Sequence, residues 1–153
     1  MIKWRELKDE DIVTRFSEKD WHNILYDISS DKELRVMLQF EYIHGMVAYN
    51  RANEPVAFAL LIEMAGRGNR IQVHGGCWGK VAWDSYSALI ELLENLFAAG
   101  YSIRSQCSLS NTRSYRFLKS VGFVNHYTSQ HYHYFWLPYK RFVNSTIYKR
   151  FNQ

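Results

Sequence analysis

One segment in the middle of the chain constrains the fold more than any other. It begins with an apolar run, Pro55 to Met64, that fits a buried strand. A Gly-containing loop and a second strand over Arg70 to His74 follow, and this arrangement predicts an antiparallel hairpin. Residues 82–99 then place leucines at helical spacing, and Tyr101 to Leu109 has the pattern of another strand. Because a long helix joins the last two strands, they are expected to pair in parallel.

Further elements flank this segment on both sides. Acidic residues at 9–11 predict the start of a helix, and helical spacing continues to Phe40 with a break near Ser29–Asp31. The tail from Lys140 is basic and aromatic. We therefore predict an α/β (α+β) fold in which helices flank a mixed central sheet of about six or seven strands, within a single domain over residues 1–153. Besides those above, the expected elements are strands over Ile2–Leu7, Tyr42–Tyr49, Phe123–Thr128 and His131–Leu137, and a short helix from Asn111 to Ser120.

The composition excludes several classes of protein. The chain is 47% hydrophobic, enough for a packed core. No apolar run approaches the roughly 20 residues that cross a bilayer, and the N-terminus lacks a signal-peptide pattern. Two cysteines give no disulfide framework, so we expect a cytoplasmic setting. The net charge of +4 suits an anionic cofactor and also weak nucleic-acid binding, without choosing between them.

The clearest motif lies at residues 111–123, which read Asn-Thr-Arg-Ser-Tyr-Arg-Phe-Leu-Lys-Ser-Val-Gly-Phe. Asn111 is followed three positions later by a small residue, Ser114, and an apolar helix then ends in Gly-Phe. This pattern resembles the GCN5-related N-acetyltransferases (GNAT). The version with Ser and Lys-x-x-Gly-Phe is most similar to the branch that acetylates the N-termini of ribosomal proteins. The resemblance covers residues 40–137 and extends further toward the N-terminus in element order alone. It implies the GNAT fold and acetyl-coenzyme A as cosubstrate.

Asn111 has two interpretations. As a helix N-cap, its side-chain oxygen would accept a backbone hydrogen bond. In the family, the pantetheine arm of the cofactor lies beside this strand end, so the resemblance makes Asn111 and Ser114 candidate cofactor contacts. A plain N-cap without a ligand remains the alternative. Gly122 is expected to end the helix with a positive φ.

The loop before the long helix corresponds to the place where the family binds the cofactor pyrophosphate. Such loops use free backbone N–H groups at a helix N-terminus. Trp78-Gly79-Lys80 matches the first three residues of the Trp-Gly-Lys-Gly that is frequent in the ribosomal-protein branch. The next glycine is replaced by Val81, whose branched side chain crowds a phosphate, while Lys80 adds charge. The resemblance therefore gives a degenerate loop, with Val73, Gly75, Gly76, Gly79, Lys80 and Val81 as candidate cofactor-binding residues.

Acetyl transfer to an amine needs a base for the amine, donors for the oxyanion and a proton for the departing thiolate. The resemblance assigns the oxyanion to backbone N–H groups between Val73 and Cys77, where Gly75–Gly76 could form a β-bulge.

The acid and the base are less well defined by the sequence. Glu63 and His74 lie at the ends of central strands and are the two candidate bases. Each has an ordinary alternative, with Glu63 solvated at a hairpin and His74 hydrogen-bonded in the core. The tyrosine that many family members use as the acid is replaced by Leu118, and Tyr115, about one helical turn earlier, is the substitute candidate.

His131 and His133 share one face of an expected strand, near His126. They lack a third acidic or thiol ligand at suitable spacing, so we expect no metal site. The resemblance implies an acetyl-coenzyme A-dependent N-acyltransferase that moves the acetyl group directly to an amine, either a protein N-terminus or a small molecule. A non-catalytic binding or assembly module of the same fold is the first alternative, and a basic RNA-binding protein is the second.

Overall fold

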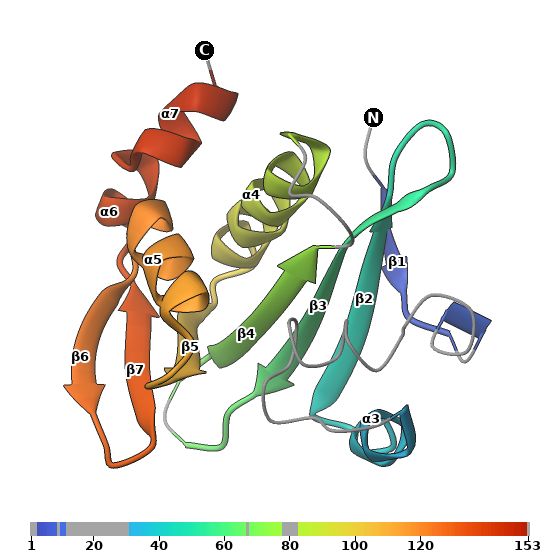
Figure 1. The fold of residues 1–153 in the computed structure, drawn as a ribbon, viewed down its shortest axis with the longest axis horizontal. Helices are drawn as coiled ribbons and strands as arrows, with labels where there is room; N and C mark the ends of the chain where they lie inside the picture. The colour runs from blue at the N-terminus through green and yellow to red at the C-terminus, as the bar shows by residue number, and fades with distance from the viewer. Residues whose placement is uncertain (1–2, 9, 12–30, 67, 78–82, 153) are drawn as a thin grey trace.

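In the part of the chain that the computed structural model describes, residues 3–8, 10–11, 31–66, 68–77 and 83–152, seven strands form one mixed sheet. The strand order is β1-β2-β3-β4-β5-β7-β6, and β4 and β5 run parallel while the other neighbours are antiparallel (Figure 1). This confirms the predicted fold class. The strands are β1 (Lys3–Glu6), β2 (Ile43–Tyr49), β3 (Pro55–Glu63), β4 (Arg70–Cys77), β5 (Ser102–Ser108), β6 (Val124–Thr128) and β7 (Tyr132–Leu137).

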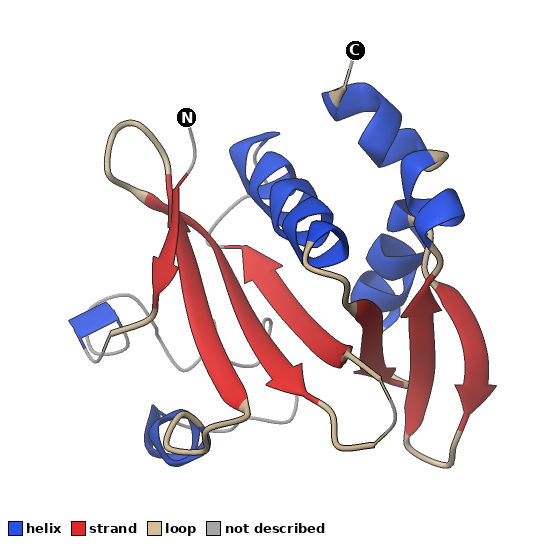
Figure 2. Ribbon diagram, turned by 180° about the vertical axis from the view of Figure 1, so that it is seen from behind, coloured by secondary structure: helices blue, strands red, loops and turns tan. Residues whose placement is uncertain are grey.

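Helices pack on both faces of the sheet (Figure 2). They are α3 (Asp31–Met37), α4 (Trp83–Ala98), α5 (Thr112–Val121), α6 (Tyr139–Val143) and α7 (Thr146–Phe151). Successive strand residues point to opposite faces, and β3 shows the division. Leu61 packs into the cluster that contains the leucines of α4. Leu60 packs instead into the cluster that contains Leu34 of α3. Because both faces of β3 are buried, its sequence is a continuous apolar run.

The central hairpin and crossover are as predicted. β3 and β4 pair antiparallel from Glu63↔Ile71 to Ala57↔Cys77, and the parallel β4–β5 pair is connected through α4. β4 is three residues longer than the sequence pattern suggested, because two glycines at its end remain paired with β3. The predicted helices over residues 12–30 lie outside the described residues.

Both ends of α5 confirm the sequence interpretation. Asn111 is the N-cap, and its side-chain oxygen accepts a hydrogen bond from the Ser114 N–H at 3.1 Å. Gly122 ends the helix with a φ of 109°. A Cβ atom at Gly122 would also lie 2.7 Å from the carbonyl oxygen of Arg141, so this position has no room for a side chain.

The basic tail forms α6 and α7, two short helices that the sequence pattern did not reveal. Phe142 is fully buried, and its ring packs against those of Phe97, at a tilted angle, and Tyr148, edge to face. The Ser145 hydroxyl accepts a hydrogen bond from the Tyr148 N–H and so caps α7. These contacts attach the tail to α4, α5 and the core behind them.

Candidate functional site

Strands β4 and β5 separate at their C-terminal ends. Their parallel register ends at the pair Gln72↔Arg104, although both strands continue beyond it. Just past this pair, the Ser105 hydroxyl donates a hydrogen bond to the Val73 carbonyl at 2.8 Å. The two strands therefore splay apart beyond this pair, which leaves a wedge between the two halves of the sheet (Figure 1).

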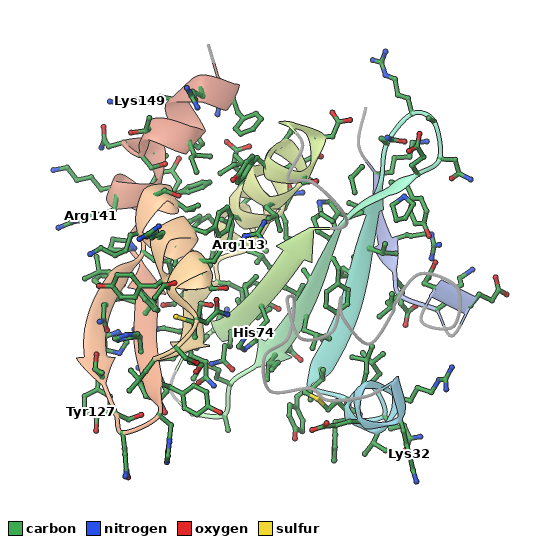
Figure 3. The ribbon with its side chains drawn as sticks, viewed as in Figure 1. Lys32, His74, Arg113, Tyr127, Arg141 and Lys149 are labelled. Atoms are coloured by element: carbon green, nitrogen blue, oxygen red, sulfur yellow. The ribbon has the colours of Figure 1, made fainter. Side chains whose placement is uncertain are left out.

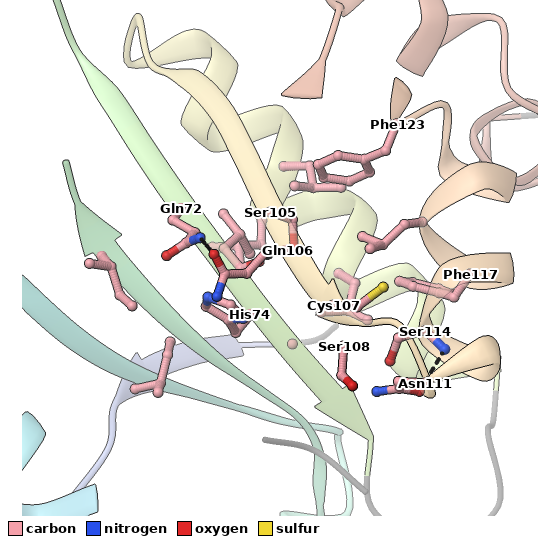
Figure 4. A pocket seen from close by; sticks show the side chains of 18 of the residues that line it. Gln72, His74, Ser105, Gln106, Cys107, Ser108, Asn111, Ser114, Phe117 and Phe123 are labelled. Atoms are coloured by element: carbon pink, nitrogen blue, oxygen red, sulfur yellow. Dashed lines mark hydrogen bonds between the residues drawn. The ribbon is translucent and has the colours of Figure 1, made fainter. Parts of the chain in front are cut away.

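A cavity of about 250 Å³ occupies this wedge and is lined from both faces of the sheet (Figure 4). Leu60, Gln72 and His74 line it from the α3 side, because they alternate with the core residues that face α4. Two ligands could therefore approach from opposite faces and meet within the wedge. The lining from the side of α4 and α5 includes Leu89, Leu93, Asn111, Ser114, Phe117 and Leu118.

The antiparallel ladder determines which β4 peptide groups face the wedge. The Met64 N–H donates to the Arg70 carbonyl at 3.0 Å, so Arg70 and every second residue after it bond toward β3. Val73 and Gly75 therefore direct their peptide groups toward β5, and the Ser105–Val73 hydrogen bond agrees with this. Since pairing with β5 has ended before Gly75, its N–H points into the wedge.

The expected β-bulge at Gly75–Gly76 is wrong. Gly75 pairs with Ala59 and Gly76 pairs with Phe58, in a register without a shift. Space explains at least one of these glycines, because a Cβ at Gly75 would lie 3.1 Å from a methyl carbon of Leu89. The splay between β4 and β5 frees the peptide group, so no bulge is needed to expose it.

Asn111 and Ser114 both line the cavity at the start of α5. The Asn111 oxygen caps the helix, while its amide nitrogen points toward the side of the cavity where Ser108 lies (Figure 4). An asparagine can use its oxygen as an acceptor and its nitrogen as a donor at the same time. The two interpretations of Asn111 are therefore compatible.

The structure separates the two candidate bases. His74 lines the cavity from the α3 side and is partly buried. Glu63, the last residue of β3, pairs with Ile71 before the point where β4 and β5 separate, and it does not line the cavity; its carboxylate is 3.3 Å from His44 Nε2 and accepts a long hydrogen bond from Tyr101, at 3.5 Å. Its side chain is 47% exposed, which corresponds to the solvated alternative.

Tyr115, the substitute acid, points away from the cavity. Its ring lies 4.9 Å from the ring of His133 and 5.6 Å from that of Phe135, so it packs onto β7. A helix turns about 100° per residue, which sends Tyr115 to β7 while Ser114 and Leu118 line the cavity. Leu118 does occupy the cavity wall, but it cannot donate a proton.

Several cavity residues escaped the sequence analysis, among them Gln72, Gln106 and Cys107. Gln72 donates from Nε2 to Gln106 Oε1 at 3.0 Å and links β4 to β5 across the wedge. Cys107 is buried in β5, and burial raises the pKa of its thiol to about 11, so it stays protonated at neutral pH. The available signal was the unusual number of polar residues in a central strand, Ser-Ile-Arg-Ser-Gln-Cys-Ser.

The loop residues Gly79, Lys80 and Val81 lie outside the described residues, and α4 begins at Trp83 shortly after them. Among the described residues, no group of three or more His, Cys, Asp or Glu side chains is arranged to hold a metal ion. No helix of the described part is long and apolar enough to span a membrane.

The seven-stranded mixed sheet, its splay and its flanking helices make this the fold of the GCN5-related N-acetyltransferases. The solved structures that share it include the spermidine N-acetyltransferase of Vibrio cholerae with coenzyme A and spermine, AAC(6')-Ib with ribostamycin and coenzyme A, and the N-acetyltransferase PseH of Campylobacter jejuni with acetyl-coenzyme A. Their TM-scores are 0.70, 0.70 and 0.66, and their sequence identities are 11%, 15% and 11%. The alignments cover 94%, 95% and 91% of this chain and 98%, 97% and 99% of the other. No protein-family model and no curated protein sequence matches this chain.

Proposed function

We propose that this protein is an acetyl-coenzyme A-dependent N-acyltransferase that transfers acetyl directly to an amine, either a small molecule or a protein N-terminus. The observation that carries the proposal is the cavity between β4 and β5, which is lined from both faces of the sheet. In a direct transfer, the thioester and the amine bind at separate sites, and their reacting atoms meet at one point. A wedge open to two faces provides that geometry.

The cavity residues fit the required chemistry. Coenzyme A supplies the activated acetyl group as a thioester. The amine nitrogen forms a bond to the carbonyl carbon, the carbon–sulfur bond breaks, the amine loses a proton and the sulfur gains one. In this proposal His74, which lines the cavity, takes the proton from the amine, and the Gly75 N–H donates to the oxyanion. Asn111 and Ser114 also line the cavity, and in this proposal they hold the pantetheine arm from the α5 side.

Charge distribution also favours an anionic cosubstrate. Residues 1–94 contain 11 Lys or Arg and 15 Asp or Glu, a formal charge of −4. Residues 95–153 contain eight Lys or Arg and no Asp or Glu, a formal charge of +8, and the two values give the total of +4. This positive part includes α5, α6 and α7, where Figure 3 labels Arg113, Arg141 and Lys149. A surface of one charge attracts phosphates and raises their association rate.

A non-catalytic module of the same fold is the second candidate function. Leu118 favours it, because an apolar side chain stands in the cavity wall at the position of the family's acid. The replacement of the expected loop glycine by Val81 favours it as well. A module of this kind could retain the fold while lacking either cofactor binding or turnover.

Titration with acetyl-coenzyme A tests the proposal. Wild-type protein should bind it and should release free thiol when an amine is added. Ser114→Trp should abolish binding, because the indole fills the cavity from α5. Thr112→Trp is the matched control, since Thr112 lies on the same helical turn but is exposed and outside the lining. Val81→Gly should bind more tightly if the loop contacts the pyrophosphate.

Two results would count against the enzyme. Absence of binding in folded wild-type protein and in Val81→Gly would leave the non-catalytic module. If Ser114→Trp and Thr112→Trp weaken acetyl-coenzyme A binding equally, the cofactor binds somewhere other than the cavity.

A further inference from the structure

A second groove lies on the sheet face opposite α4 and α5. Arg70 at the start of β4 and Arg104 in β5 line it together with Tyr134 of β7 and His126 of β6. The register places Arg104 beside Gln72, so the two arginines stand on the same face of adjacent strands. Within the described residues, the lining contains no carboxylate.

This groove adjoins the transfer cavity. Gln72 and Ser105 line both of them. Gln72 also hydrogen-bonds Gln106 of the cavity wall at 3.0 Å. A ligand that occupies the groove could therefore extend into the wedge from the side where His74 lies, which is the side proposed for the amine.

The surroundings of Arg104 disfavour its positive charge. Its Nε atom is buried and has no hydrogen-bond partner. Burial first, and the nearby charge of Arg70 second, lower the pKa of its guanidinium. Buried polar groups in proteins normally have hydrogen-bond partners, so a buried group without one needs an explanation. An anion that paired with both arginines would satisfy the charge and relieve the repulsion.

The neighbouring aromatic residue restricts the direction of this guanidinium. The Arg104 guanidinium carbon lies 5.6 Å from the centre of the Trp136 ring, in a cation–π contact. Trp136 stands opposite Arg104 in the β5–β7 register, so strand pairing fixes the contact. An arginine positioned in this way presents a planar fork that matches a carboxylate or a phosphate.

We infer that this groove binds an anionic group of the acetyl acceptor, so that the substrate is an amine that also carries a carboxylate or a phosphate. The inference rests on the proposed function and specifies its substrate class. Polyamines, such as the spermine bound to the Vibrio cholerae enzyme, should be poor acceptors here, because two arginines repel a polycation.

Binding of small probes, measured without acetyl-coenzyme A, tests the groove independently of catalysis. Three matched probes are β-alanine, β-alaninamide and 1,3-diaminopropane, and inorganic phosphate is the anion alone. Arginine Nε–H signals of the nitrogen-15-labelled full-length protein report the contact. β-Alanine and phosphate should shift the Arg104 signal and compete with each other. β-Alaninamide should bind about tenfold more weakly or worse, because it lacks the charged hydrogen-bond acceptor, and the diamine should not bind.

Variants localise the effect. Arg104→Gln and Arg70→Gln should each weaken β-alanine binding about tenfold or more, whereas Arg51→Gln, exposed in the turn before β3, should not. Arg104→Gln removes a desolvated charge beside another cation, so it should not lower the Tm. A Tm that falls with binding unchanged would assign Arg104 a structural role and overturn the inference.

Further outcomes separate the groove from the enzyme. Equal binding of β-alanine and β-alaninamide would overturn the inference that the groove binds an anionic group, whether or not the protein acetylates amines. Probe binding at Arg104 in a protein that never binds acetyl-coenzyme A would support the anion site and reject the proposed function. Tight, salt-sensitive binding of a short RNA without preference among the small probes would overturn the small-acceptor inference.

Discussion

The Ser105 hydroxyl donates to the Val73 carbonyl at 2.8 Å, at the point where β4 and β5 stop pairing. A splayed pair of parallel strands leaves backbone groups without ladder partners, and buried backbone groups need them. Ser105 satisfies one such carbonyl with a side chain. The next peptide group on that edge, at Gly75, is then the one left facing the cavity.

Ser105→Ala should therefore lower both stability and cofactor affinity. The variant leaves the Val73 carbonyl without this partner in a buried position, which should cost about 1–2 kcal/mol in the free energy of unfolding. Urea denaturation and calorimetric titration with acetyl-coenzyme A measure the two effects. Ser145→Ala is the matched control, because Ser145 is also buried and donates to a carbonyl, that of Phe142, far from the wedge. A similar loss of affinity in both variants would exclude a local role for Ser105.

Asn111 allows the cap to be separated from the ligand contact. Asn111→Asp keeps the oxygen that accepts from Ser114 N–H, and its charge suits a helix N-terminus. It removes the amide donors that face the cavity. We expect stability within about 0.5 kcal/mol of wild type and a fall of about tenfold or more in acetyl-coenzyme A affinity.

Asn111→Ala completes this comparison. It removes the cap as well, so stability should fall by about 1 kcal/mol, with a similar loss of cofactor affinity. Calorimetry and chemical denaturation on both variants give the result. If Asn111→Asp binds the cofactor as wild type does, Asn111 serves as a helix cap alone.

Tyr115→Phe should leave the acetylation rate and the stability nearly unchanged. The contacts of Tyr115 with His133 and Phe135 involve its ring, which phenylalanine retains. Tyr115→Ala should instead lose about 3 kcal/mol of stability, because it removes a partly buried aromatic side chain. Steady-state kinetics decide the question. A drop in kcat of about a hundredfold in Tyr115→Phe would restore the tyrosine as a general acid.

The sequence was most informative where local rules act alone. The two ends of α5 depend on Asn111 and Gly122, whose preferences are local, and both were predicted correctly. The hairpin and the crossover followed from loop length and helix length. The α6 and α7 helices were missed because they are short, and much of their stability comes from Phe142 packing against distant residues.

The site was harder to predict because it depends on side-chain direction across the sheet. Glu63 and His74 looked equivalent as residues at strand ends. The β3–β4 register places Glu63 opposite Ile71, before β4 and β5 separate, and His74 beyond that point, so only His74 lines the cavity. Tyr115 differed from Ser114 by one helical step, which was enough to turn it to β7. The groove at Arg70 and Arg104 needs the β4–β5 register, which no local pattern supplies.

Asp11, which follows the N-terminal strand β1, makes a pH-dependent contribution to the stability of the protein. Asp11 is buried, and burial by itself would raise its pKa. Hydrogen bonds from Arg5, Tyr49 and the Lys8 N–H outweigh that effect and lower the pKa from 3.8 to about 2. Arg5 donates to both carboxylate oxygens at 2.6 and 2.8 Å, and the Tyr49 hydroxyl donates at 2.6 Å. This network connects β1 and the residues after it to the end of β2.

A carboxylate with a depressed pKa in the folded state stabilises the protein above the unfolded-state value and loses that contribution as the pH falls through the folded-state value. Wild-type protein should therefore lose about 2 kcal/mol of unfolding free energy from this group between about pH 4 and pH 2. Asp11→Asn should be less stable at neutral pH and should lack this part of the acid dependence. Urea denaturation over that pH range measures both. Asp84→Asn, at an exposed position of α4, should keep the wild-type dependence, and a wild-type dependence in Asp11→Asn would reject the role of the network.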